Sequence, residues 1–467
     1  MLNRWKKNMC LVSAAVLAVG IMAGSWKIEN TDHGQDAQNV QLTSASQAAL
    51  TVQNAKAWTT VQPDEKNNVS VMETQETDKD ILQSFATGPG LQNLSLKDNY
   101  ATYQWGLKND GEYQLTKLIS NFRNVDQKTV MGKQADGVIA LPGTIGPGAY
   151  SAKITDAVNG VDINIQPAWD LYKAAENKRQ VTVAIIDTGI DISHPDLKDA
   201  IWTNAGEIPD DGIDNDGNGY IDDVHGWNFF SNNNQVFVGT EDEHGTHSAG
   251  TIGAAAENGG TVGITDNQYV KIMPVKALGS DNGLGTSQTV INAIKYAEAN
   301  GASICNLSLG GVYQSEALGE AIKNSKMLFI VAAGNGNALG IGYDTDKYPV
   351  WPACFPYDNI ISVANLLFDG TLDESSNYGA ETVDIAAPGS FILSTTTDRT
   401  YGFMSGTSMS APMVTGVAAM LYSYRPELTV LQVKDILLKS SRKMDTLTGK
   451  MVSGGLLDAY AALQYQQ

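Results

Sequence analysis

The sequence is poor in histidine, cysteine and basic residues. Among 467 residues there are five histidines and three cysteines, and 31 lysines and arginines stand against 51 aspartates and glutamates. The net charge of −20 argues against nucleic acid or an anionic membrane surface as a partner, because both select basic patches. It is compatible with the binding of cations. Since histidines are so few, the position of each one is informative.

Three cysteines are too few for a disulfide framework. Cys10 lies at the start of the N-terminal apolar stretch, whereas Cys305 and Cys354 have the strongly apolar neighbours typical of buried thiols. The sequence leaves open whether Cys305 and Cys354 pair with each other.

The first 25 residues have the layout of a secretory signal. Arg4, Lys6 and Lys7 precede an apolar run over residues 9–24 that ends in small residues. The run is only slightly shorter than a bilayer span, so an uncleaved membrane anchor is the alternative. We therefore expect a secreted protein, or one that is anchored to the outer face of the cell membrane.

Residues 26–97 are polar and contain few aromatic side chains. Such a stretch buries too little apolar surface to order itself firmly, so we interpret it as a linker or pro-segment. The composition changes at residue 98, where aromatic residues become frequent. Residues 98–467 are predicted to form one domain that begins with an N-terminal arm.

Within this domain, apolar runs alternate with helix-like segments. The run VTVAIID at residues 181–187 is typical of a strand buried on both faces. Further strands are predicted at residues 269–277, 303–309, 327–333, 360–366 and 383–386, and helices at 287–299, 315–324, 411–422 and 429–439. This alternation predicts an α/β fold with a doubly wound, mainly parallel sheet and helices on both faces.

Two polar motifs stand at the ends of predicted elements. Asp187 ends the strand at residues 181–187, and ligands of open α/β sheets bind beyond the carboxyl ends of the strands. His244 and His247 open a small-residue helix pattern. They are three residues apart with no glutamate between them, unlike the HExxH helix of zinc proteases. One of the two is therefore predicted to act as a general base.

A third motif, GTSMSAP at residues 406–412, leads from a turn into an apolar helix. Ser408 lies at the helix start, where unpaired backbone N–H groups carry partial positive charge. A serine there can attack a carbonyl group, and a backbone N–H can stabilise the oxyanion that results. Pro412 has no N–H to donate to the carbonyl of Ser408, four residues earlier, and loosens the helix start.

The motifs DTG at 187–189, HGTH at 244–247 and GTSMSAP at 406–412, in this order, resemble those of the subtilisin-like serine peptidases. The resemblance extends from about residue 98 to the C-terminus. It implies that Ser408 is the nucleophile, that His244 is its base, and that Asp187 orients and stabilises the imidazolium. Asn335 matches the family's side-chain oxyanion donor. His247 is expected to pack beside the triad on the same helix.

The same resemblance implies where a substrate would bind. Ser308, Leu309 and Gly310 resemble the edge strand that pairs with an extended peptide, and Gly279 would lie on the opposite wall. Val350 stands where the family often has glycine at the floor of the specificity pocket. We therefore expect a shallow pocket that prefers small side chains, next to a Trp351–Pro352 bond that is often cis in the family.

A polar insert over residues 204–223 carries oxygen-bearing side chains on alternate residues. The order DxDxNG at 214–219 matches the front half of a calcium loop, although His225 stands where such a loop ends in glutamate. Carboxylates at this density repel one another without a cation. We therefore expect calcium rather than a bare solvent-exposed loop, with the ligands Asp214, Asp216, Asn218 and Asp222.

A second calcium site is implied by the family resemblance alone. Asp196 and the loop at residues 255–261 match a structural calcium site of relatives, with Glu257 in place of the more usual asparagine.

Together these features predict a secreted serine endopeptidase that acts on proteins or peptides. A catalytically silent peptide receptor is disfavoured because all four chemical positions are intact. An esterase of the α/β-hydrolase type would need the GxSxG motif and a serine that precedes the histidine, and neither is present. A carboxyl-type serine peptidase would have glutamate in place of His244.

Overall fold

The computed structural model describes residues 49–52, 98, 101–111, 138–140, 151–153, 157–279, 284–337 and 340–466. They all fall within one unit, Ala45–Gln467. The predicted signal or anchor over residues 1–25 lies outside the described residues, as does most of the segment 26–97. In the part of the chain that is described, no helix has both the length and the apolar character needed to cross a membrane.

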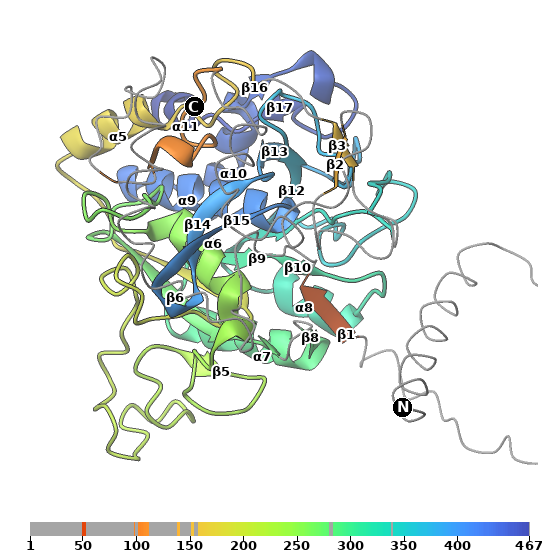
Figure 1. Ribbon diagram of the computed structural model, residues 1–467. Helices are drawn as coiled ribbons and strands as arrows, with labels where there is room; N and C mark the ends of the chain where they lie inside the picture. Colours follow the sequence, from red (N-terminus) through yellow and green to blue (C-terminus); the bar gives the residue numbers. More distant parts are fainter. Residues whose placement is uncertain are drawn as a thin grey trace, which may run out of the picture. The chain divides into compact units, whose positions relative to one another are not determined.

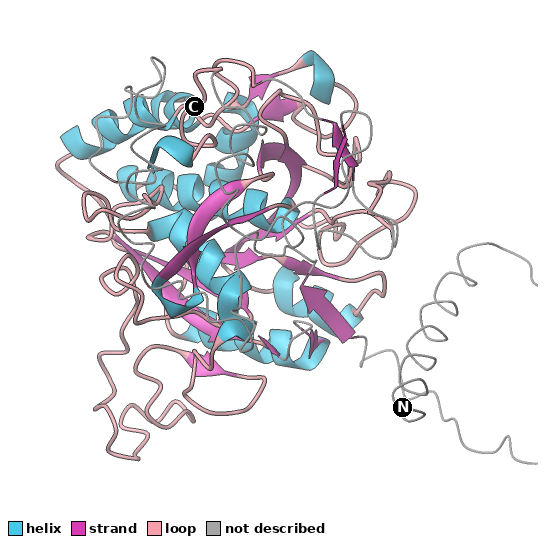
Figure 2. Cartoon of the chain, viewed as in Figure 1, coloured by secondary structure: helices cyan, strands magenta, loops and turns pink. Residues whose placement is uncertain are grey.

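The central sheet has nine strands and is mainly parallel, which confirms the predicted fold class (Figures 1 and 2). β4 (Val181–Asp187) lies inside it between β6 (Val270–Lys276) and β9 (Ile304–Leu307), parallel to both. From β9 outward follow β11 (Leu328–Ala332), β12 (Ile360–Leu366), β13 (Ile385–Pro388), β17 (Gly455–Leu456) and the antiparallel β16 (Arg442–Lys443). β5 (Trp227–Asn228) closes the other edge beside β6.

Helices cover both faces of this sheet because its strands are apolar on both sides. On β4, Val183 and Ile185 enter one core cluster, whereas Ala184 and Ile186 enter the other. The first cluster contains side chains of α5 (Ile165–Ala174), α6 (Glu243–Gly253), α9 (Thr407–Tyr424), α10 (Val430–Ser440) and α11 (Ala459–Gln464). The second contains side chains of α7 (Ser287–Ala299) and α8 (Glu316–Lys323).

Smaller elements complete the described part of the chain. A hairpin of β14 (Ile392–Thr396) and β15 (Thr400–Met404) packs on α6; the sequence analysis did not predict it, because its serines and threonines obscure the apolar pattern. The other short elements are β2 (Val138–Ala140), β3 (Ser151–Lys153), η4 (Ala101–Tyr103), η5 (Thr240–Asp242), η6 (Thr397–Arg399) and η7 (Asp445–Leu447).

A second sheet contains four short antiparallel strands, in the order β10–β1–β8–β7. They are β10 (Leu309–Gly310), β1 (Ala49–Val52), β8 (Leu284–Thr286) and β7 (Leu278–Gly279). β1 comes from the polar N-terminal segment, yet it pairs with β10 on one side and with β8 on the other (Figure 1).

Candidate active site

Asp187 is the last residue of β4 and is 1% exposed. Its Oδ1 lies 2.7 Å from Nδ1 of His244 and accepts a hydrogen bond from the backbone N–H of Thr188 at 2.6 Å. Its own carbonyl accepts from the N–H of Ala277, next to β6, at 3.0 Å. The carboxylate is thus held at the carboxyl edge of the sheet, where the sequence predicted it.

His244 is the second residue of α6, and close packing sets its position. A Cβ on Gly245 would collide with the carbonyl of Gly189, so only glycine lets the helix start approach the end of β4. The N–H of Gly245 also donates to Oγ1 of Thr188 at 3.1 Å. Nδ1 of His244 therefore faces Asp187, and its buried Nε2 has no hydrogen-bond partner among the described residues.

Ser408 is the second residue of α9, which packs against α6. Its Oγ donates to the carbonyl of Ser308 at 3.3 Å, and Oγ of Ser308 donates to the carbonyl of Ser408 at 2.9 Å. No hydrogen bond joins Oγ of Ser408 to Nε2 of His244 among the described residues, so the contact between the two stays a prediction. Catalytic hydrogen bonds are often completed only when substrate is bound.

Asn335 follows β11 and lies beside the start of α9. Its Oδ1 accepts hydrogen bonds from the N–H of Thr407 at 2.8 Å and from Oγ1 of Thr407 at 2.9 Å. Gly406 has a φ of 149°, and a Cβ there would come within 3.0 Å of Nδ2 of Asn335. The amide is thereby oriented with its oxygen on Thr407 and its nitrogen near the turn that precedes Ser408.

The predicted substrate residues lie around the second sheet. Leu309 and Gly310 form β10 and pair with Val52 and Thr51 of β1, while Gly279 in β7 pairs with β8 and is one strand further away. Val350 is buried, and its N–H donates to Sγ of Cys354 at 3.3 Å. The Trp351–Pro352 bond is cis, as expected from the resemblance.

Lys276, a buried lysine that the sequence analysis did not single out, pairs with Asp187 on the neighbouring strand β6. Nζ of Lys276 is fully buried, 2.6 Å from Oδ1 of Asp242 and 2.7 Å from Oε1 of Glu241, and it also donates to the carbonyl of Thr188. Burial raises the pKa of Asp242, and Lys276 opposes that rise. The cluster ties the start of α6 to the end of β4, so it supports the placement of His244.

Two more titratable groups adjoin His244 on α6. Burial lowers the pKa of His247 to about 3, and Nε2 of this ring is bonded to the carbonyl of Ile392 at 2.9 Å. Burial also raises the pKa of Glu243 to about 7, although the nearby imidazole of His244 opposes the rise. His247 is therefore a neutral packing residue, whereas Glu243 changes charge near neutral pH.

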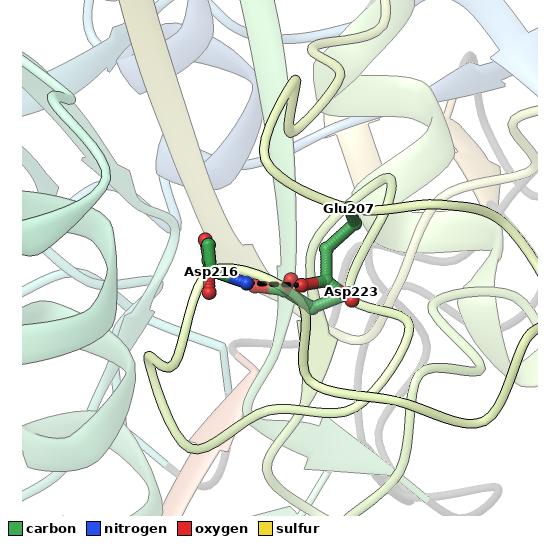
Figure 3. Close-up of side chains that lie close together, drawn as sticks. All are labelled: Glu207, Asp216 and Asp223. Carbon is green, nitrogen blue, oxygen red and sulfur yellow. Dashed lines mark hydrogen bonds between the residues drawn. The ribbon is translucent and has the colours of Figure 1, made fainter.

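In the polar insert over residues 204–223, three carboxylates lie close together: those of Glu207, Asp216 and Asp223 (Figure 3). One oxygen of each lies within 4.8 Å of the others. Nδ2 of Asn204 donates to both Asp216 and Asp223, at 2.9 and 2.8 Å, and holds them together. Three carboxylate oxygens at this separation could hold a metal ion.

Of the expected calcium ligands, Asp216 belongs to this cluster, and Nδ2 of Asn218 donates to Asp216 and to Asp223, at 3.1 Å each. Asp214 accepts from the N–H groups of Asn218 and Gly219, and Asp222 accepts from those of residues 211 and 212, as in ordinary turns. The sequence analysis omitted Glu207 and Asp223 from the ligands. Glu207 lies outside the DxDxNG pattern, so no local spacing could have identified it.

Asp196 lies apart from this cluster and is already surrounded by protein donors. It accepts from Nδ2 of Asn258 at 2.9 Å, from the hydroxyl of Tyr401 at 3.0 Å and from the N–H of Thr261 at 3.0 Å. The N–H of Glu257 donates to Asp98 at 2.7 Å. A calcium ion bound by Asp196 and Glu257 stays a prediction.

Cys305 and Cys354 are both buried and both free, so they form no disulfide. Burial raises the pKa of each thiol. They are inert core residues, as their apolar neighbours suggested.

An α/β sheet that carries a buried Asp–His pair at its carboxyl edge and a serine at a nearby helix start is the architecture of a serine-type hydrolase. The chain belongs to the subtilase family, whose model matches residues 178–456, and it is accordingly a serine-type endopeptidase.

Several named proteases are similar to this chain. The major intracellular serine protease of Bacillus subtilis (strain 168) is 36% identical over 268 residues, which cover 57% of this chain and 75% of that protein. Thermitase of Thermoactinomyces vulgaris is 33% identical over 306 residues, which cover 65% of this chain and 94% of that protein.

Subtilisin-like protease 1 of Plasmodium berghei is 32% identical over 327 residues, which cover 64% of this chain; the chain spans about half the length of the Plasmodium relatives. A solved structure of a cold-adapted subtilisin-like serine proteinase matches with 28% identity and a TM-score of 0.46, over 61% of this chain and 91% of that one.

Proposed function

We propose that the chain hydrolyses peptide bonds through the triad Asp187, His244 and Ser408, assisted by Asn335. The observation that carries this proposal is the buried 2.7 Å contact between Asp187 and Nδ1 of His244. It leaves Nε2, the other ring nitrogen, to act as the base for a serine on the adjoining helix α9.

In the proposed reaction, Oγ of Ser408 attacks the peptide carbonyl carbon while its proton passes to Nε2 of His244. Asp187 stabilises the imidazolium that forms. The side-chain amide of Asn335 and a backbone N–H at the start of α9 stabilise the oxyanion. His244 then gives the proton to the leaving amine, and a water molecule hydrolyses the acyl-enzyme by the same sequence of steps.

The test compares the full chain with its Ser408→Ala variant on casein, and measures labelling by a fluorophosphonate. We expect the variant to lose both cleavage and labelling while it keeps the melting temperature of the parent. Equal casein cleavage by the two proteins would remove Ser408 from the mechanism.

The N-terminal region is proposed to be a secretory signal followed by a pro-segment. The pairing of β1 with β10 supports the second part, because an extended peptide substrate is expected to pair with the same strand. The pro-segment would then occupy the groove as a substrate does, and would have to leave before the enzyme acts on other proteins.

A proline at Thr51, which lacks the N–H of a paired residue, tests the pro-segment. In the full chain, Thr51→Pro should shorten the lag before activity appears, whereas the control Gln75→Pro, outside β1, should not. Equal lags would count against the pro-segment. The N-terminal sequence of the extracellular protein tests the signal, and recovery of the intact chain in the membrane fraction would favour the anchor.

We further propose that Glu207, Asp216 and Asp223 hold a structural calcium ion. Three carboxylates this close together repel one another, and a divalent cation removes the repulsion. Added calcium should raise the melting temperature of Ser408→Ala, and Asp223→Asn should abolish most of that rise. An unchanged melting temperature with calcium or EDTA would speak against the site.

The preference for small side chains at Val350 stays part of the proposal. Profiling with a peptide library tests it, and a strong preference for phenylalanine or arginine next to the cleaved bond would contradict it.

A further inference from the structure

The helix that carries Ser408 has a gap in its hydrogen bonding. In an α-helix the carbonyl of each residue accepts from the N–H four residues later. For Ser408 that residue is Pro412, which lies inside α9 and has no N–H. The backbone of α9 therefore cannot supply the usual donor to the carbonyl of the proposed nucleophile.

The side chain of Ser308 supplies a donor at this place. Its Oγ donates to the carbonyl of Ser408 at 2.9 Å, and its own carbonyl accepts from Oγ of Ser408 at 3.3 Å. Both residues are fully buried. The two serines are thus joined at two points, one on the backbone of Ser408 and one on its hydroxyl.

A buried polar chain orients the hydroxyl of Ser308. Nδ2 of Asn306 donates to Oγ of Ser308 at 2.9 Å, and Oγ1 of Thr415 lies 2.9 Å from Oδ1 of Asn306 and 2.9 Å from the carbonyl of Ala411. Because the amide of Asn306 donates to Ser308, the hydroxyl proton of Ser308 is directed to Ser408. Asn306 and Thr415 are also fully buried, so water does not compete for these bonds.

We propose that Ser308 is a positioning residue. Its hydroxyl donates to the carbonyl of Ser408 in place of the backbone N–H that Pro412 lacks. The proposal rests on Ser408 being the nucleophile. Ser308 is already expected to belong to the strand that pairs with a peptide substrate. The proposal gives its hydroxyl a second role, which is to hold Ser408 in place. Asn306 and Thr415 contribute by fixing the direction of that hydroxyl.

The expected effect is on turnover more than on substrate binding. Ser308→Ala keeps the backbone groups that face a peptide, so KM should change less than about threefold. A misplacement of the nucleophile by about 1 Å can cost about 100-fold, and we expect kcat to fall about 10- to 100-fold. Ser362→Ala is the matched control, since Ser362 is equally buried on β12 and its Oγ has no described partner. This control should keep kcat within about twofold.

The decisive test is a double-mutant cycle with Pro412→Ala, which restores the backbone N–H. In the Pro412→Ala background, that N–H can bond to the carbonyl of Ser408, so removal of the Ser308 hydroxyl should lower kcat less than about fivefold. An equal loss of kcat in the parent and in the Pro412→Ala background would overturn the proposal, as would a wild-type kcat for Ser308→Ala. If Ser308→Ala does not fold, Thr415→Val takes its place in the same cycle with the same criteria.

The cycle also separates this inference from the proposed function. Ser408→Ala that retains activity would refute the assignment of the nucleophile. Ser408→Ala without activity, together with equal effects of Ser308→Ala in both backgrounds, would refute only the positioning role.

Discussion

Acid should destabilise this protein through His247, a histidine that packs in the core rather than taking part in catalysis. His247 is fully buried on α6, and its pKa falls from 6.5 to about 3, chiefly because burial disfavours the charged ring. Between these two values the unfolded chain binds a proton that the folded chain does not. Stability is therefore fully present above pH 6.5 and is lost as the pH falls toward 3.

The size of the effect follows from the two pKa values. Each pH unit inside the window costs about 1.4 kcal/mol, so His247 alone should remove about 3 kcal/mol between pH 7 and pH 4. That is a large part of the 5–15 kcal/mol typical of a folded protein. Below about pH 3 the folded ring would also be charged, and this source of instability would stop growing.

Urea unfolding at pH 7 and pH 4 measures the effect, in a Ser408→Ala background that prevents self-digestion. His247→Gln places an amide N–H donor where Nε2 of His247 faces the carbonyl of Ile392, but it cannot gain a proton. We expect its loss of unfolding free energy between the two pH values to be smaller by about 3 kcal/mol than that of the parent. Identical losses in both proteins, with equal m-values, would refute the reasoning.

Three further substitutions probe the site. Asp187→Asn should lower kcat about 10⁴-fold with a preserved melting temperature, because the amide no longer holds the imidazole in its working state; a loss below tenfold would contradict the triad. Glu243→Gln should remove a loss of unfolding free energy between pH 4.5 and 7, because burial raises the pKa of this carboxyl from 4.5 to about 7 and the folded chain keeps a proton that the unfolded chain releases; an unchanged pH dependence of the unfolding free energy would contradict this. Asp242→Asn leaves Lys276 buried without its closest carboxylate and should cost about 3–5 kcal/mol of unfolding free energy. Glu241→Gln, at a partly exposed carboxylate, should cost clearly less. Equal losses would argue that the Lys276–Asp242 pair is not the stronger of the two.

Local patterns were sufficient to predict the fold and the position of Asp187, whereas the choice of His244 came from the family resemblance. The run at residues 181–187 is apolar on both faces, and that alone calls for a parallel sheet covered on both sides. Parallel strands end at a common edge, so a functional carboxylate was expected at the end of the strand, and the resemblance to the subtilisin-like peptidases implied that His244 meets it there. The 2.7 Å contact between Asp187 and His244 confirms that they do.

The polar insert over residues 204–223 shows where local patterns were insufficient. The DxDxNG spacing pointed to Asp216, which lies in the carboxylate cluster, and also to Asp214 and Asp222, which lie outside it and accept from turn N–H groups. Glu207 joins the cluster from outside the pattern. Its place depends on how the loop folds back on itself, which residue spacing does not encode.

What the sequence by itself determined is therefore the set of elements and the chemistry at their ends, because hydrophobic period, turn residues and helix starts act over only a few residues. The tertiary structure alone decided which distant groups meet: Ser308 with the carbonyl of Ser408, 100 residues apart, and β1 with the strands β8 and β10. The physical reason is that a buried polar group must find a partner wherever packing brings one within reach, and that partner can come from any part of the chain.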